Sequence, residues 1–278
     1  MNQEFFSFSI SNFDFSPKSS SIIFNSLIKH IFFMKGQIPT TFEQLQNNLN
    51  QNEKQKNFQS KNIKSKLTKK SSKFLENIQI WFQTIDSILF NNIGFKDENE
   101  KKLINQLDNQ MQIENELDQN ISRIKLKKIV LSFGNIITNP KEVYVIKTSK
   151  LTDHLNTENF GNEVLFVRET IQQFIINEPQ IFRNKLVCTR CFMFLLIGFY
   201  SKKEEFFKLE NFNFGIFQKN LFPKKKQFIT QVLQKGHHLL IDINLEKDEN
   251  MQEELQKKSF FSKKIWFSFN NFVQGFNI

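Results

Sequence analysis

The chain has 278 residues, a formal net charge of +10 and only two cysteines. This length accommodates one sizeable domain or two small ones, and a hydrophobic fraction of 39% is ordinary for a chain that buries a core. Two cysteines exclude a disulfide framework and fit a reducing compartment. The charge would suit nucleic acid, anionic membrane or an acidic protein, but lysine carries most of it, which favours a solvated surface over recognition of bases.

Nothing near the start of the sequence is typical of a targeting signal. The first fifteen residues alternate Phe with Ser and Asn and carry Glu4 and Asp14, so they lack a basic start and a continuous apolar stretch. The most apolar run, residues 191–200, is about half as long as a membrane helix. We therefore expect a nuclear or cytoplasmic protein without membrane contacts, with residues 1–20 as a tail before a single domain at 21–278.

Apolar residues at helical spacing predict three main amphipathic helices, at residues 22–35, 74–90 and 164–176. Ser20 or Ser21 is placed to cap the first, and Gly36 to end it. A short helix begins at residues 41–45, with Thr40 or Thr41 as its cap.

Two polar stretches interrupt this pattern. Residues 46–73 are almost wholly Asn, Gln, Lys and Ser, which predicts a flexible linker too poor in apolar residues to pack. Residues 97–120 are charged and rich in amides, and we interpret them as an insertion outside the core.

Most of the remaining apolar runs predict strands, at residues 128–133, 143–147, 186–199, 228–233, 238–245 and 265–269. The first two would form a hairpin through a turn at Asn139 and Pro140. Helices followed by several strands predict an α+β domain with the helices against one sheet.

Chemical motifs give no support for catalysis. Cys188 and Cys191 have the spacing of a metal or redox pair, but a structural zinc needs four ligands and no second pair is present. His237 and His238 follow Gly236 where a turn leads into a strand, so we interpret them as turn or core residues. The common phosphate-binding and hydrolase motifs are absent from the sequence. We expect no enzyme, cofactor or metal site.

Four blocks of sequence occur in order between Ile22 and Phe276. They are residues 27–31 (LIKHI) with 37–39 (QIP) and 42–45 (FEQL); 130–134 (VLSFG) with 140–144 (PKEVY); 236–237 (GH) with the strand after it; and 265–267 (IWF) with 275–276 (GF). In this order they resemble the comet family, whose members share a leucine-lysine-histidine-isoleucine helix, a glutamine-leucine-proline turn, a proline-lysine-glutamate hairpin, a glycine-histidine turn and an isoleucine-tryptophan-phenylalanine ending.

The resemblance implies a HORMA-like fold related to Mad-two, with three main helices on a mostly antiparallel sheet. The C-terminal strand would fold across its own domain like a built-in ligand. It also implies a non-catalytic adaptor that docks on the closed conformer of Mad-two and presents it to a hexameric AAA+ ATPase of the Pch-two type. The ATPase then unfolds part of Mad-two, which dismantles the mitotic checkpoint complex and silences the checkpoint. The resemblance therefore also implies a location in the nucleus and cytoplasm, and at the spindle or kinetochore in mitosis.

Two alternatives to this function stay open. A basic nucleic-acid-binding domain would carry lysines and aromatic residues on a common face and bind in a salt-dependent way. A HORMA-like scaffold could instead serve meiotic chromosome proteins, because a shared fold does not fix the function.

The resemblance also assigns two binding surfaces. The Mad-two-binding surface falls at Met34 and Ile171, with Arg168 and Phe174 beside them. Met34 stands where vertebrate relatives have glutamine, and Ile171 where they have phenylalanine, which leaves a more apolar patch. The family's ATPase-facing loop carries proline and lysine, matched here by Pro223 and Lys224. On composition alone, the basic run at residues 224–226 would be a solvated loop.

Overall fold

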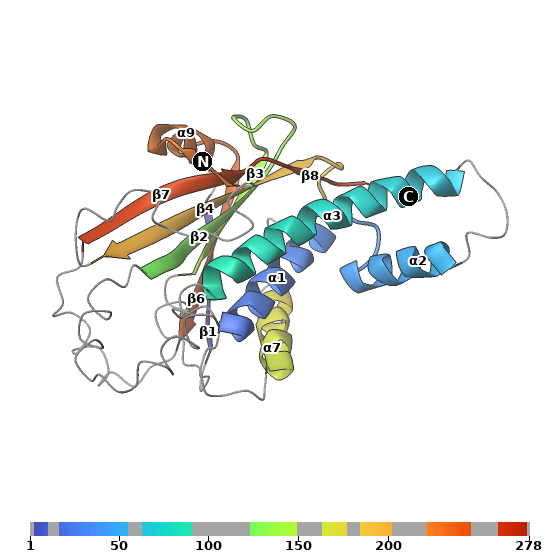
Figure 1. The fold of residues 1–278 in the computed structure, drawn as a ribbon, viewed down its shortest axis with the longest axis horizontal. Helices are drawn as coiled ribbons and strands as arrows, with labels where there is room; N and C mark the ends of the chain where they lie inside the picture. Colours follow the sequence, from blue (N-terminus) through green and yellow to red (C-terminus); the bar gives the residue numbers. More distant parts are fainter. Residues whose placement is uncertain are drawn as a thin grey trace, which may run out of the picture.

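A computed structural model of the chain describes residues 3–10, 17–54, 63–90, 123–148, 163–176, 184–201, 221–245 and 261–276. These residues form a mixed α+β fold with one eight-stranded sheet (Figure 1). The helices are α1 (Pro17–Met34), α2 (Phe42–Lys54), α3 (Ile63–Phe90), α7 (Glu163–Ile176) and α9 (Lys226–Leu233). The strands are β1 (Gln3–Ile10), β2 (Arg123–Phe133), β3 (Glu142–Lys147), β4 (Arg190–Ser201), β5 (Leu221–Lys224), β6 (His237–Leu245), β7 (Phe261–Phe269) and β8 (Val273–Gln274).

The strand order in the sheet is β1-β6-β3-β2-β4-β7-β5, and β8 pairs with one end of β4. Strand β6 runs parallel to both of its neighbours, β1 and β3, while the other described pairs are antiparallel. The predicted hairpin of β2 and β3 is confirmed, with Leu131 opposite Tyr144. Because β7 and β8 both pair with β4, the last described segment of the chain is part of the central sheet.

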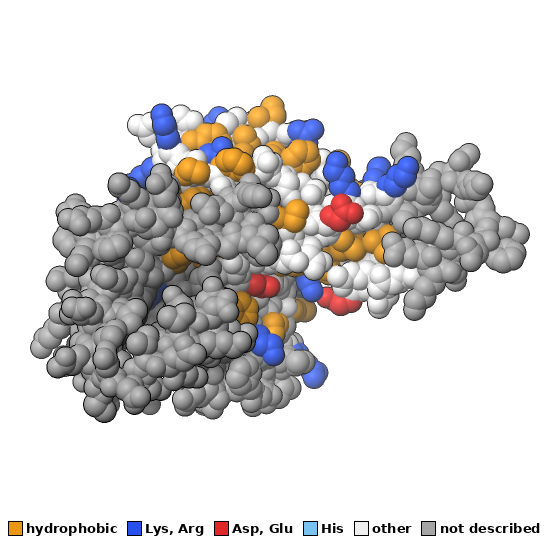
Figure 2. All heavy atoms as spheres, viewed as in Figure 1, with side chains coloured by type: hydrophobic (Ala, Val, Ile, Leu, Met, Phe, Trp, Pro, Cys, Tyr) orange, Lys and Arg blue, Asp and Glu red, His pale blue; other side chains and the backbone are white. Residues whose placement is uncertain are grey.

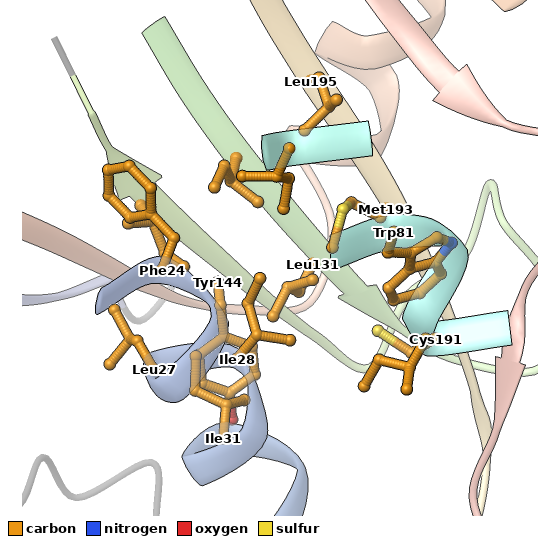
Figure 3. Close-up of a cluster of buried hydrophobic side chains, with 14 of the residues drawn as sticks. Phe24, Leu27, Ile28, Ile31, Trp81, Leu131, Tyr144, Cys191, Met193 and Leu195 are labelled. Carbon is orange, nitrogen blue, oxygen red and sulfur yellow. The ribbon is translucent and has the colours of Figure 1, made fainter. Parts of the chain in front are cut away.

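The main core lies between one face of this sheet and helices α1 and α3. Every apolar residue of the predicted stripes on the first two main helices is buried: Ile23, Leu27, Ile28, Ile31 and Phe32 on α1, and Phe74, Ile78, Trp81, Ile85 and Leu89 on α3. Figure 3 shows Phe24, Leu27, Ile28 and Ile31 of α1 and Trp81 of α3 beside the strand residues Leu131, Tyr144, Cys191 and Met193. Helix α7 lies beside α1 and β1 (Figure 1).

The opposite face of the sheet carries a smaller core. Ile229 and Val232 of α9 pack there against Val130, Val143 and Phe194 of the strands. Since side chains alternate along a strand, neighbours such as Val130 and Leu131 belong to opposite faces. Helix α9 therefore lies on the other side of the sheet from α1 and α3 (Figure 1).

The prediction of a tail at residues 1–20 is wrong. Strand β1 pairs in parallel with β6, and α1 begins at Pro17, a residue well suited to a first helical position. Ser20 and Ser21 are therefore buried inside the helix instead of capping it. Ser21 donates a hydrogen bond to Asp86 of α3, which explains how a helix with polar residues in its first turns packs against a second helix.

The prediction of a flexible linker at 46–73 is also wrong where the structure describes it. Helix α2 continues to Lys54 and α3 begins at Ile63. The cap at Thr41 is confirmed: its Oγ1 accepts from the Gln44 backbone N–H at 3.3 Å, and the Gln44 side chain accepts from the Thr41 N–H at 3.2 Å, a capping box. Phe42 and Leu45 are buried, so a few apolar residues suffice to hold α2 on α3. The predicted insertion at 97–120 lies outside the described residues.

Two further predictions need correction. Residues 228–233 belong to helix α9, because Ile229 and Val232 are three residues apart and both point at the sheet. Strand β4 begins only at Arg190, and the run before it binds the end of α1: the Leu186 N–H donates to the Lys35 carbonyl at 3.1 Å.

Candidate functional site

A buried polar cluster joins the end of α1 to strand β3. The Lys35 side chain is fully buried, and its Nζ lies 3.0 Å from Glu142 Oε1 and donates to the Asn184 carbonyl. The Tyr144 hydroxyl donates to the other carboxylate oxygen of Glu142 at 2.5 Å. Burial, together with Glu142, raises the pKa of Tyr144 far above its ordinary range, so the phenol stays protonated. The cluster fixes the end of α1 and has no exposed reactive group.

The turn after this cluster ties three distant segments together. Gly36 has a φ of +66°, a conformation that favours glycine. The buried Gln37 accepts from the Thr189 N–H at 2.9 Å through its side chain, and its carbonyl accepts from the Phe276 N–H at 2.9 Å. A Cβ at Gly275 would clash with the Gln37 side chain. The close approach of the chain's last described residues to α1 therefore depends on this glycine.

A second turn seats strand β6 beside the β2–β3 hairpin. Gly236 has a φ of +82°, and a Cβ there would lie 2.8 Å from the Lys141 carbonyl oxygen. The His237 N–H donates to the same carbonyl at 2.9 Å. His238 is buried, and its Nε2 lies 2.7 Å from the Lys235 carbonyl. Both histidines lie at the start of β6, directly after the turn, as predicted.

The residues assigned to Mad-two binding lie on two helices that the structure brings together. Met34 is the last residue of α1 and is half-buried against the core. On α7, Arg168 is exposed and Ile171 is half-buried. Helices α1 and α7 lie side by side (Figure 1). Phe174 belongs to α7, but its side chain is outside the described ones.

Three exposed apolar residues lie on the same two helices. Phe33 is 40% exposed beside Met34, and Ile175 and Ile176 at the end of α7 are 56% and 77% exposed. These three residues were not predicted from the sequence, although apolar residues outside the buried stripe of a helix indicate an exposed apolar surface. We call Phe33, Met34, Arg168, Ile171, Ile175 and Ile176 the helical surface.

The residues assigned to ATPase binding lie on strand β5, and the basic run at 224–226 continues from this strand into helix α9, so the prediction of a loop there is wrong. Pro223 and Lys224 belong to β5 and pair with Phe267 and Trp266 of β7. An edge strand is the place in a sheet where proline is tolerated. Lys225 and Lys226 begin α9 and are both exposed. Phe222, which precedes them, is 43% exposed. We call Phe222, Pro223, Lys224, Lys225 and Lys226 the basic ridge.

The charge on the basic ridge is unfavourable for α9 itself. The N-terminus of a helix carries a partial positive charge, so cations there destabilise it and anions stabilise it. Yet Lys225 occupies the N-cap without a side-chain cap, Lys226 follows, and the first turn contains no acidic residue. An acidic group bound from outside would relieve this repulsion. Helix α9 and the helical surface lie on opposite sides of the sheet (Figure 1).

The two cysteines occupy different environments. Cys191 is fully buried in the main core. Cys188 precedes β4, so the prediction that both lie in one strand is wrong; it is half-buried, with its thiol 3.8 Å from the Gly36 carbonyl. Within the described residues, no group of three or more His, Cys, Asp or Glu is arranged to hold a metal ion. None of the helices in the described ranges is long and apolar enough to cross a membrane.

The reactivity of Cys188 is a first testable prediction. Burial raises the pKa of its thiol above the ordinary value, against the opposing effects of a backbone hydrogen bond and Lys70. Because the thiolate is the nucleophile, the folded chain should react with N-ethylmaleimide more slowly than free cysteine at the same pH, and faster as the pH rises. Mass spectrometry should find one modified thiol per folded chain, and none in Cys188→Ser. Equal modification of both cysteines would contradict the structure.

No protein-family model matches this chain. Nor does any curated protein match it in sequence.

Proposed function

We propose that this chain is a HORMA-like adaptor that binds the closed conformer of Mad-two. In this proposal it presents Mad-two to an AAA+ ATPase of the Pch-two type and so promotes disassembly of the mitotic checkpoint complex. Its action is non-catalytic, and it operates in the nucleus and cytoplasm and at the spindle or kinetochore.

The observation that carries the proposal is that the blocks resembling comet proteins meet in space. Gln37 of the first block bonds to Phe276 of the last through a backbone hydrogen bond of 2.9 Å. Lys141 of the second block accepts from His237 of the third, and Gly236 leaves the room for this contact. These contacts join positions 239 and 96 apart in the sequence, and this supports the proposal that the four blocks belong to one fold.

The C-terminal segment also fits a HORMA-like domain with a built-in ligand. Strand β7 is inserted between β4 and β5, and Phe276 then reaches α3, where its ring lies 5.6 Å from that of Phe74. The segment thus occupies the sheet and the helical layer of its own domain. In this proposal, α1, α3 and α7 are the three main helices of the HORMA-like domain.

The helical surface is the proposed contact with Mad-two. Apolar anchors at the centre of an interface typically lose about 2 kcal/mol or more of binding free energy on truncation, which is about 30-fold in Kd. Met34 and Ile171 are half-buried, so part of each side chain is already packed before binding and less conformational freedom is left to lose.

The basic ridge is the proposed contact with the ATPase. Pro223 and the pairing with β7 hold the strand, while Lys224, Lys225 and Lys226 present positive charge to an acidic rim. Such contacts act mainly on the rate of association and weaken with salt. The uncapped start of α9 adds a reason for an acidic partner to bind at this place.

These two surfaces should be separable by mutation. Met34→Glu with Ile171→Glu should abolish capture of closed Mad-two, because two charges would enter an apolar contact, and Phe33→Glu should weaken it from a more exposed position. Lys224→Glu, Lys225→Glu and Lys226→Glu together should abolish stimulation of the ATPase while Mad-two capture persists. Pull-down with purified Mad-two and ATPase-driven release of Mad-two measure the two activities.

The controls separate function from folding. Lys263→Glu with Lys264→Glu reverses two exposed charges on β7 outside its pairing with β5 and should leave both activities intact. Melting curves should show that each variant is folded. Folded variants that lose both activities together would contradict the division into two surfaces. Absence of Mad-two capture combined with stoichiometric, salt-sensitive binding of nucleic acid would overturn the adaptor itself.

A further inference from the structure

A third surface lies apart from the helical surface and the basic ridge. A groove of about 770 Å³ runs between the first half of α3 and the C-terminal segment. Lys70, Lys73, Phe74 and Asn77 of α3 form one wall, and residues 270–272 and 274–276 form the other. Cys188 closes one side. Figure 2 shows Lys or Arg side chains gathered over the part of α3 nearest the chain's C-terminus.

The floor of the groove is apolar and its rim is basic. Phe74 and Phe276 are buried at the floor with their rings edge-to-face, 5.6 Å apart at 70°. Lys70 and Lys73 are exposed and three positions apart on one face of α3. No acidic residue lines the groove within the described part of the chain. Glu76, one turn further along α3, faces the separate groove against α2 and accepts from Ser72 at 3.1 Å.

The walls of the groove are held by hydrogen bonds that tie the C-terminal segment to α3. Asn77 donates to the Phe272 carbonyl at 3.1 Å, and the Trp81 indole donates to Asn271 at 3.1 Å. Arg190 lies 4.7 Å from the centre of the Phe272 ring. A site whose walls are fixed before binding spends little free energy on ordering, so a short ligand can bind there.

We propose that this groove binds an acidic peptide segment of a partner protein. The carboxylates of the peptide would face Lys70 and Lys73. An apolar side chain of the peptide, placed between its acidic residues, would contact Phe74 and Phe276 at the floor. Single-stranded nucleic acid fits less well, because base stacking needs open aromatic faces. Here Phe74 and Phe276 are buried against each other, and the Arg190 guanidinium lies over the ring of Phe272.

The proposal goes beyond the adaptor function, because neither the helical surface nor the basic ridge contributes a residue to the groove. It implies that the protein can hold a third partner while both other surfaces are occupied. Charge reversal at the groove should therefore leave Mad-two capture and ATPase stimulation unchanged, so failure of one proposal is distinguishable from failure of the other.

A labelled peptide tests the charge complementarity. The probe is the fluorescein-labelled peptide Asp-Glu-Phe-Asp-Glu, and its binding to the full chain is followed by fluorescence anisotropy. Lys70→Glu with Lys73→Glu should weaken binding about tenfold or more, because two attractions become repulsions. Lys263→Glu with Lys264→Glu changes the net charge equally and should leave binding unchanged. Equal weakening by the two pairs, or no binding at millimolar peptide, would overturn the proposal.

The thiol of Cys188 gives an independent readout of the same site. Because Cys188 lines the groove and Cys191 is fully buried, bound peptide should slow the reaction of the folded chain with N-ethylmaleimide, a neutral reagent. This protection should persist in the Lys263 and Lys264 variant and disappear in the Lys70 and Lys73 variant. A version of the peptide with Ala in place of Phe should protect less. Unchanged reactivity under saturating peptide would place the binding elsewhere and overturn the assignment to this groove.

Discussion

Replacing Lys35 with methionine should lower the free energy of unfolding by about 3–5 kcal/mol. The change removes one partner of a buried ion pair and leaves Glu142, which is more than nine-tenths buried, without the cation that lies 3.0 Å from its carboxylate, although the Tyr144 hydroxyl still donates to it. It also removes the donor to the Asn184 carbonyl. Glu142→Gln should destabilise the fold to a similar extent, because it removes the carboxylate that neutralises the buried Lys35 ammonium.

Urea unfolding of three variants measures this effect against a matched control. Glu43→Gln breaks the exposed pair between Glu43 and Lys29, which are 3.2 Å apart, and should change stability by less than about 1 kcal/mol. The double change Lys35→Met with Glu142→Gln should recover part of the loss, since no unpaired charge remains buried. If Lys35→Met is no more destabilising than Glu43→Gln, the cluster does not hold the end of α1.

The sequence was most informative where the apolar pattern was long and regular. The stripes from Ile23 to Phe32 and from Phe74 to Leu89 predicted two helices whose marked residues are all buried. The alternation of Ile265, Phe267 and Phe269 predicted a strand, and β7 is present there. A long run of apolar residues with regular helical or strand spacing leaves few alternatives to that secondary structure, because every other arrangement would expose several large apolar side chains at once.

Short or polar segments were predicted less well. Residues 228–233 contain four apolar positions, which fit either a strand or one turn of helix, and only the contact of Ile229 and Val232 with the sheet decides for α9. The predicted linker failed because Asn, Gln and Lys are compatible with a helix that rests on a neighbour through few residues, here Phe42 and Leu45. Local composition could not reveal that neighbour.

In the candidate site too, local patterns could be predicted from the sequence and contacts between distant residues could not. Met34 and Ile171 could be placed on helices from the pattern alone, and those helices do lie together. The pairing of Lys35 with Glu142 joins residues 107 positions apart, and nothing in the local sequence of either one indicates its partner. The groove beside α3 was not foreseeable for the same reason, since Lys70 meets the C-terminal segment only in the folded chain.

Removal of residues 259–278 should abolish the native fold. The deletion takes away β7, which lies between β4 and β5, and β8, which pairs with the start of β4. It also removes the buried side chains of Phe267, Phe269, Val273 and Phe276. Loss of a single buried phenylalanine side chain costs about 3–5 kcal/mol, so the summed loss exceeds the total stability of a typical domain, about 5–15 kcal/mol.

The truncated chain should therefore aggregate or lose its cooperative unfolding transition, as followed by size-exclusion chromatography and circular dichroism. Phe276→Ala provides a graded test, since it should lower stability by about 3–5 kcal/mol without removing a strand. Gln274→Ala changes an exposed neighbour in β8 and should be nearly neutral. A soluble truncated chain with an unchanged melting curve would mean that the sheet is complete without β7, and the last segment would then be a tail instead of a part of the core.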